Sequence, residues 1–162
     1  RGESAHLRNH KSAKPVTMYL YGKTAANAIA IMSYLAERPD ELVGSSEIAG
    51  ARRISRALTA KLLTQLSAAG LVRGQPGPGG GYMLAKDASE INLFSIVALF
   101  EQTEGPSLCP FGQGWCGSGE PCPLHDTLLS LQERSEEFLK NTRFSVFRPE
   151  QAEVGGRGRD AD

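Results

Sequence analysis

The chain has little cysteine: its 162 residues include three, and all of them lie between positions 109 and 122. An odd number leaves at least one thiol outside any set of intrachain disulfides. The sequence also lacks an apolar run close to the roughly 20 residues that a membrane-spanning helix needs. Its first residues are basic without an apolar core, so we expect no secretory signal, no membrane partner and a cytoplasmic location. In a reducing compartment, clustered cysteines favour a metal over disulfides.

Acidic residues are missing from the middle of the chain, although the formal net charge of the whole is zero. No Asp or Glu occurs from Ile48 to Lys86, where six basic residues stand. From Asp87 to Asn141 the balance reverses, with nine acidic and two basic residues. Chance drift in surface charge is the simpler explanation. We favour a phosphate-binding face in the first stretch, because an ordinary solvated surface mixes charges of both signs.

The spacing of apolar residues predicts five helices and one β-hairpin. The helices are expected at residues 23–37, 47–52, 56–69, 91–101 and 125–140, and the strands at 71–73 and 82–84. Ser45 and Ser46 are candidate caps of the second helix, and Ser55 of the third. The buried stripe of the third helix is expected to comprise Leu58, Leu62, Leu66 and Ala69. Three helices followed by a glycine-tipped hairpin indicate a winged helix-turn-helix, so the fold class is mainly α with a small β-hairpin wing.

The chain is expected to divide into five segments. These are a disordered extension at 1–17, a winged helix-turn-helix DNA-binding domain at 18–86, a linking helix and cysteine loop at 87–123, a dimerisation helix at 124–148 and a disordered tail at 149–162. The dimerisation helix is inferred from the apolar stripe that includes Leu128, Leu131 and Phe138, for which the chain offers no evident partner surface. Packing of this helix onto its own domain is the alternative.

Candidate DNA-binding residues lie on the expected recognition helix, in the turn before it and on the wing. An α-helix fits the major groove, and the first turns of a recognition helix reach the base edges. We expect Arg56 to contact guanine or phosphate, Arg52 and Arg53 to contact phosphates, and Ala57 and Ala60 to permit close approach. The remaining candidates are Ser55, Lys61, Arg73, Gly79, Gly80 and Gly81. The wing glycines would let backbone amides approach a phosphate or the minor groove.

Four soft ligands are clustered in sequence: Cys109, Cys116, Cys122 and His125, separated by six, five and two residues. Thiolates and imidazole at such close spacing indicate an iron–sulfur cluster or a structural zinc ion. Paired Cys-x-x-Cys knuckles, which are usual in zinc sites, are missing here. A thiol enzyme would need a low-pKa cysteine beside a base, and no second acid–base pair or cofactor motif is present. We therefore expect no enzyme; a protein-binding adaptor remains open.

Several stretches together resemble the winged-helix regulators of the IscR/NsrR/RirA type, which are bacterial sensors of iron–sulfur status, nitric oxide or iron. The resemblance runs from about residue 18 to 147 and is carried by 23–36, 47–49, 54–55, 69–72, 77–82, 86–88 and the three-cysteine loop. It implies a homodimeric repressor or activator that binds a palindromic double-stranded DNA operator.

The same resemblance implies that the three cysteines hold an iron–sulfur cluster. IscR-like members use as the fourth ligand a histidine that two residues separate from the last cysteine, and His125 stands at that position. NsrR-like members use an acid near the start of the first helix, where this chain has none. The resemblance thus favours a 2Fe–2S cluster, with a 4Fe–4S cluster or zinc as alternatives. The first cysteine spacing is six residues rather than the usual five.

Overall fold

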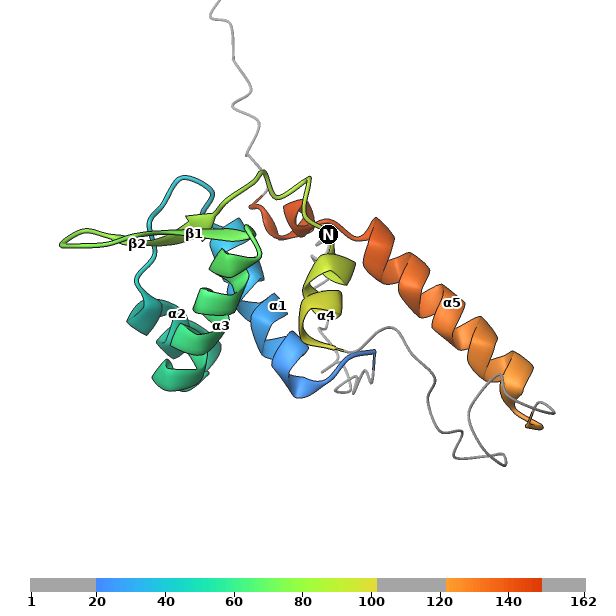
Figure 1. The fold of residues 1–162 in the computed structure, drawn as a ribbon. Coiled ribbons are helices and arrows are strands. Elements are labelled where there is room, and N and C mark those ends of the chain that lie inside the picture. The colour runs from blue at the N-terminus through green and yellow to red at the C-terminus, as the bar shows by residue number, and fades with distance from the viewer. Residues whose placement is uncertain (1–19, 102–121, 150–162) are drawn as a thin grey trace, which may run out of the picture.

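The computed structural model describes residues 20–101 and 122–149. The expected extension at 1–17, all but the first residue of the expected tail, and Cys109 and Cys116 lie outside the described residues. The elements in chain order are α1 (Lys23–Ala36), α2 (Ser45–Arg52), α3 (Arg56–Ala68), β1 (Val72–Gln75), β2 (Gly81–Leu84), α4 (Leu93–Phe100), α5 (His125–Asn141) and the 3-10 helix η1 (Phe144–Phe147). The hairpin and the α2–α3 pair lie at one end of the molecule and α5 at the other (Figure 1). This arrangement confirms the mainly α winged helix-turn-helix.

Helices α2 and α3 form the helix-turn-helix pair. The turn between them begins at Arg53, which adopts the left-handed conformation with φ 54°. The buried Ile54 donates its backbone N–H to the Ala49 carbonyl at 3.0 Å. The Ser55 hydroxyl accepts a hydrogen bond from the Leu58 N–H at 3.3 Å, which confirms the predicted cap of α3. These contacts fix the direction in which α3 leaves the turn.

The end of α3 is set by a glycine. Gly70 has φ 68°, a conformation that residues with a Cβ rarely adopt. The Leu71 N–H donates to the Leu66 carbonyl and the Gly70 N–H to the Ser67 carbonyl, each at 3.0 Å. This is the Schellman arrangement, which satisfies the last carbonyls of a helix. The chain is thereby redirected into the hairpin.

The hairpin forms the wing. Strands β1 and β2 are antiparallel, with Val72 opposite Leu84 and Gln75 opposite Gly81. Val43 exchanges two backbone hydrogen bonds of 2.9 Å with Tyr82, so β2 is paired on both sides. A Cβ at Gly81 would lie 2.8 Å from backbone atoms of Val43, which leaves room only for glycine. The wing is therefore anchored to the segment between α1 and α2.

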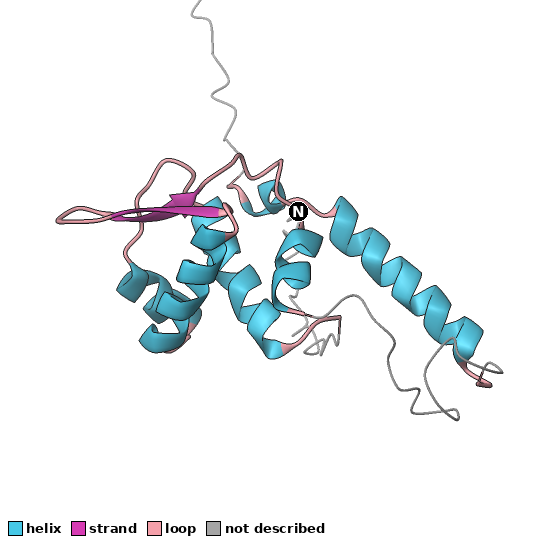
Figure 2. Ribbon diagram, in the orientation of Figure 1, coloured by secondary structure: helices cyan, strands magenta, loops and turns pink. Residues whose placement is uncertain are grey.

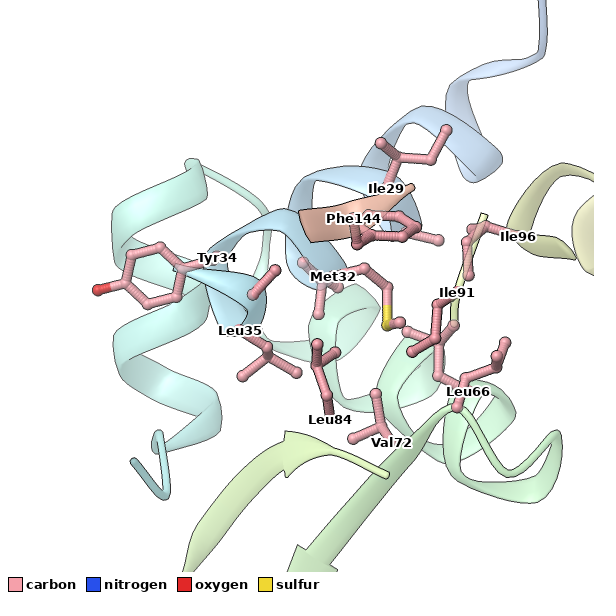
Figure 3. Close-up of a cluster of buried hydrophobic side chains, with 14 of the residues drawn as sticks. Ile29, Met32, Tyr34, Leu35, Leu66, Val72, Leu84, Ile91, Ile96 and Phe144 are labelled. Atoms are coloured by element: carbon pink, nitrogen blue, oxygen red, sulfur yellow. The ribbon is translucent and has the colours of Figure 1, made fainter. Parts of the chain in front are cut away.

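One apolar core joins the segments before and after the wing. Side chains from α1, α3, both strands, α4 and η1 meet in this core, as the residues labelled in Figure 3 show. Phe144 of η1 is fully buried and is among its largest members. The segment after α5 is held in place by the Phe144 N–H, which donates to the Ile91 carbonyl at 2.9 Å. The C-terminal segment therefore returns to the body that carries the helix-turn-helix.

Helix α5 differs from the other helices because it projects from this body, with its C-terminal end beside the body and its first turn far from it (Figure 2). Within the described structure Leu139, near its C-terminal end, is its one buried residue. The large apolar side chains that remain exposed on or just before α5 are Leu124, Leu128, Leu129, Leu131 and Phe138. The amphipathic pattern that predicted this helix thus has most of its apolar face uncovered.

Several predicted details are wrong. Helix α2 begins at Ser45 rather than residue 47, and its N-cap is Gly44, so neither serine acts as a side-chain cap. In α3 the fully buried leucines are Leu62, Leu63 and Leu66, whereas Leu58 is half-buried and Ala69 is exposed. The stripe shifts because the core contacts α3 across a wider arc than one i, i+4 row. Helix α4 begins at Leu93, since Asn92 caps it by accepting from the Ser95 N–H at 2.9 Å.

Candidate nucleic-acid interface and cysteine loop

The outward face of α3 is basic and small. Arg56, Ala57, Ala60 and Lys61 are exposed on this face, opposite the leucines that enter the core. Arg53 in the preceding turn is exposed as well, and so is Arg73 on β1. Among the described residues, none of these four cations forms an ion pair with an acid. The face therefore presents positive charge that no acid within residues 20–101 and 122–149 neutralises.

Arg52 is placed differently from the other predicted DNA-binding cations. Its guanidinium pairs with the Glu37 carboxylate through Nη2 and Oε1 and lies 5.0 Å from the centre of the Tyr34 ring. Its side chain is 28% exposed. In this structure Arg52 thus joins the end of α2 to α1. Its partner Glu37 precedes the stretch from Ile48 to Lys86 that contains no acid.

The three predicted wing glycines have distinct surroundings. Gly79 is exposed at the tip and has φ 74°. The Gly80 N–H donates to the Gly77 carbonyl at 2.9 Å, so this amide is used within the turn. Gly81 is buried against Val43. Of these three glycines, Gly79 is consequently the one that is exposed to solvent.

A cleft of about 480 Å³ separates the wing from the start of α2. Polar residues line it from both sides, with Ser45 and Ser46 on α2 and Gln75 on the wing. The first turn of α2 has no side-chain cap, because its N-cap is Gly44. Uncapped backbone N–H groups and the helix dipole give such a helix start a partial positive charge. Glu47 also lies in this first turn, so the cleft adds polar hydrogen-bonding groups beside α3 rather than net positive charge.

Of the four predicted cluster ligands, the structure describes Cys122 and His125. The His125 N–H donates to the Cys122 carbonyl at 3.0 Å, which closes a turn at the start of α5. Cys122 is a half-buried free thiol. Within residues 20–101 and 122–149, no group of three or more Cys, His, Asp or Glu side chains could hold a metal ion. Cys109 and Cys116, which lie outside these ranges, would have to complete the set.

An unanticipated contact joins the residue before the cysteine loop to the start of α1. Glu101 stands just before residues 102–121, and its Oε1 accepts a hydrogen bond from the Gly22 N–H at 2.9 Å. Gly22 is the N-cap of α1, which has neither a side-chain cap nor an acid in its first turn. A carboxylate at a helix N-terminus is stabilising. The missing cap of α1 was a signal in the sequence, but nothing there indicated which residue supplies it.

Comparison with known proteins identifies the family. The model of the Rrf2 family, described as iron-dependent transcriptional regulator, matches residues 21–147. The chain belongs to the Rrf2 family. The transcriptional regulator IscR of Serratia proteamaculans is 36% identical over 121 residues, which cover 75% of this chain and 70% of that relative. The predicted family and the expectation of a non-enzymatic protein are thereby confirmed.

Solved structures of Rrf2-type proteins share the fold. CymR, the global cysteine regulator of B. subtilis, matches with a TM-score of 0.68 at 21% identity, over 80% of this chain and 97% of that chain. IscR of T. potens matches with a TM-score of 0.62 at 19% identity, over 82% and 85% respectively. Rrf2 proteins are transcriptional regulators that bind DNA. None of the helices described here is long and apolar enough to cross a membrane.

Proposed function

We propose that this Rrf2-family regulator binds a two-fold symmetric DNA operator as a homodimer, and that an iron–sulfur cluster controls the binding. The observation that carries the DNA-binding part is the outward face of α3. Its cations have no acidic partner among the described residues, and the stretch from Ile48 to Lys86 contains no acid at all. A protein surface that is not meant for a polyanion ordinarily neutralises its cations with nearby carboxylates.

The residues take distinct roles in this proposal. Arg56, in the first turn of α3, reaches a guanine edge or a phosphate, while Arg53 and Lys61 contact phosphates. Ala57 and Ala60 leave space for the helix to approach the groove floor. Arg73 and the Gly79 backbone contact the DNA backbone that lies beside the wing. Ser55 acts through its cap of α3, and the surroundings of Gly80 and Gly81 favour a structural role for both.

The DNA-binding part is tested by salt dependence. Each protein–phosphate contact contributes about 0.9 to the slope of log affinity against log salt concentration. Arg56→Ala is expected to lower affinity for duplex DNA about tenfold and to reduce that slope. Arg134→Ala is the matched control, because Arg134 is an exposed arginine on α5, far from α3. Equal effects of the two substitutions would contradict the assigned face.

The proposed dimer is formed through α5. Leu124, Leu128, Leu131 and Phe138 recur at spacings of four, three and seven residues, which places them on one face of a helix. These side chains are exposed, although apolar residues of this size favour burial. A second copy of the same helix would cover them. Such a dimer could place two α3 helices one DNA turn apart, at roughly 34 Å.

The proposed cluster ligands are Cys109, Cys116, Cys122 and His125. Three thiolates and one imidazole suit an iron–sulfur cluster, and the turn from Cys122 to His125 keeps two donors close in space. The family description as iron-dependent and the IscR relatives support iron over zinc. A bound 2Fe–2S cluster supplies a site that responds to redox state, iron or nitric oxide. An imidazole ligand can also be protonated, which makes its bond the more labile one.

The position of these ligands suggests how the control reaches DNA. His125 is the first residue of α5, and Glu101 ties the near end of the cysteine loop to the N-cap of α1. Ordering or release of the loop would act on α5 and α1 together. A shift of α5 alters the spacing of the two α3 helices in the dimer, and with it the operator affinity.

Metal analysis tests the cluster. Protein purified without oxygen is expected to be brown, with two irons and two acid-labile sulfides per chain. His125→Ala should change the visible spectrum, whereas Asp126→Ala, at the next position on the helix, should not. Four irons and four sulfides would replace the 2Fe–2S assignment by 4Fe–4S. A colourless protein with one zinc would contradict the cluster and leave a DNA-binding protein with a structural metal.

A further inference from the structure

Helix α2 has little apolar contact to set its orientation. It is eight residues long, and its buried residues are Ile48 and Ala49. Two neighbouring apolar contacts leave a short helix able to rotate about them. The orientation of α2 matters because the Arg53–Ser55 turn and the first turn of α3 follow directly from its end. Polar contacts to α1 add to the packing of α2 against α3 in fixing this orientation.

A polar cluster, here the Tyr34 cluster, joins the last turn of α1 to both ends of α2. Its members are Tyr34, Glu37, Arg38, Glu47 and Arg52. The Tyr34 hydroxyl donates to Glu47 Oε1 at 3.0 Å, and Glu47 lies in the first turn of α2. At the other end of α2, Arg52 pairs with Glu37. The two contacts hold α2 at points one and a half turns apart.

The Tyr34 ring lies between these two contacts. The guanidinium of Arg38 is 3.8 Å and that of Arg52 is 5.0 Å from the ring centre. Glu37 links both arginines, since its Oε2 lies 3.2 Å from Arg38 Nη1 and its Oε1 pairs with Arg52. Figure 3 shows the Tyr34 hydroxyl directed away from the apolar core, towards α2. Glu37 is thereby opposed by both arginines, whereas Glu47 is held through the neutral Tyr34 hydroxyl.

The protonation state of Tyr34 suits this role. Burial raises the pKa of the Tyr34 hydroxyl above its ordinary value, and the hydrogen bond to Glu47 raises it further. The phenol is thus a proton donor throughout the physiological range. Arg52 Nε, by contrast, is buried without a hydrogen-bond partner among the described residues. An unpaired buried N–H costs stability, so the contacts of the cluster do not all favour the fold.

We propose that Tyr34 is a positioning residue for DNA recognition: with Glu47, Glu37 and Arg52 it fixes α2 against α1 and thereby sets where the Arg53–Ser55 turn and the start of α3 meet the DNA. This inference rests on the proposed function. It also reassigns Arg52, which the sequence had suggested as a phosphate contact, to the holding of α2. Operator discrimination depends on the cluster more strongly than charge-driven binding to any duplex does.

Tyr34→Phe tests the proposal, because it removes only the hydroxyl. The probes are a duplex enriched from a random library by the wild-type protein and a scrambled duplex of equal length. The ratio of the two affinities is expected to fall about fivefold or more, while affinity for the scrambled duplex stays unchanged. Amide hydrogen exchange at Arg53 and Ile54 should become faster. Tyr21→Phe is the matched control, since Tyr21 is a tyrosine that packs, partly buried, against the same core.

A second pair of variants separates positioning from stability. Glu47→Gln keeps an acceptor for the phenol and should keep the affinity ratio, whereas Glu47→Ala should lower it as Tyr34→Phe does. The double variant Tyr34→Phe/Glu47→Ala should be no worse than either single one. An unchanged ratio in Tyr34→Phe would overturn this inference alone. Wild-type protein that enriches no duplex would overturn the proposed function and this inference with it.

Discussion

Helices α3 and α5 are both amphipathic, but within the described residues only the apolar face of α3 is covered. In α3 the side chains of Leu62, Leu63 and Leu66 are fully buried by the protein's own core. In α5 Leu131 is 56% exposed, and Leu139 is the buried residue within the described structure. The polar side of α3 is uniformly basic, whereas that of α5 carries both signs of charge.

The difference indicates what each helix lacks. Helix α3 has its apolar partner and presents unneutralised cations, so its missing partner is an anion. Helix α5 carries charges of both signs, with acids in excess, and exposed leucines, so its missing partner is an apolar surface. The same chain thus shows one face suited to DNA and another suited to a second copy of itself.

The largest expected effect is a loss of stability when a buried leucine of α3 is truncated. Leu66→Ala should lower the free energy of unfolding by about 2–5 kcal/mol, because it leaves a cavity among fully buried side chains. Chemical denaturation monitored by circular dichroism measures the loss. Leu128→Ala, which removes the same atoms from an exposed site on α5, should change the free energy of unfolding of the monomer far less. Equal losses would contradict the contrast between the two helices.

Charge placed on the apolar stripe of α5 should prevent dimerisation. Leu131→Asp is expected to raise the dissociation constant of the dimer about a hundredfold, since a carboxylate would be buried without a partner. Sedimentation velocity measures the oligomeric state. Leu129→Asp is the matched control, because Leu129 is similarly exposed but residues two apart do not share a helix face. A dimer that survives Leu131→Asp would exclude this stripe as the interface.

A smaller effect concerns the buried side of α3. Thr59 is fully buried, and its Oγ1 has no hydrogen-bond partner among the described residues. Thr59→Val removes the unpaired hydroxyl at nearly constant shape, so the free energy of unfolding should rise by about 1 kcal/mol. A thermal shift of a few degrees upwards would be the readout. A drop in melting temperature would show that the hydroxyl is satisfied in solution.

The smallest effect is a pH dependence of the free energy of unfolding, which arises from the contact between Asp87 and Arg148. Hydrogen bonds from Ser89, followed by the contact with Arg148, hold the pKa of Asp87 well below its usual range. A lowered carboxyl pKa stabilises the fold above the unfolded-state value of about 4, and this stabilisation is lost as pH falls further. Asp87→Asn should therefore be less stable than wild type at pH 7, with a difference that narrows from pH 4 to pH 2. A constant difference in denaturation midpoint would contradict the assignment.

Local patterns in the sequence predicted most of the helix-turn-helix and the wing. Ser55, Gly70 and the acid-free stretch are short-range signals with direct physical meaning, and the structure follows the first two closely. Contacts between distant residues could not be read in the same way. The pairing of Arg52 with Glu37, the hydrogen bond from Gly22 to Glu101 and the burial of Phe144 each depend on the tertiary arrangement. Arg52 looked equivalent to Arg53 for this reason.

The sequence predicted which types of residue form the candidate site, but not the surroundings of each residue. Residue types and spacing indicated a basic recognition helix and a soft-ligand loop. Which wing glycine is open to solvent depended on packing: Gly81 is covered by Val43, and the Gly80 amide is used within the turn. A sequence cannot indicate such neighbours, because they come from segments that are separated along the chain.

Selection of DNA by the purified dimer from a random duplex library tests the central claim most directly. The account predicts an enriched sequence with two-fold symmetry, whose half-sites are centred one helical turn, roughly 34 Å, apart. Its binding should weaken steeply with salt and should weaken further in Arg56→Ala. Enrichment of no sequence, or binding that is insensitive to both salt and Arg56→Ala, would contradict the assignment of α3 and the wing as a DNA-binding surface.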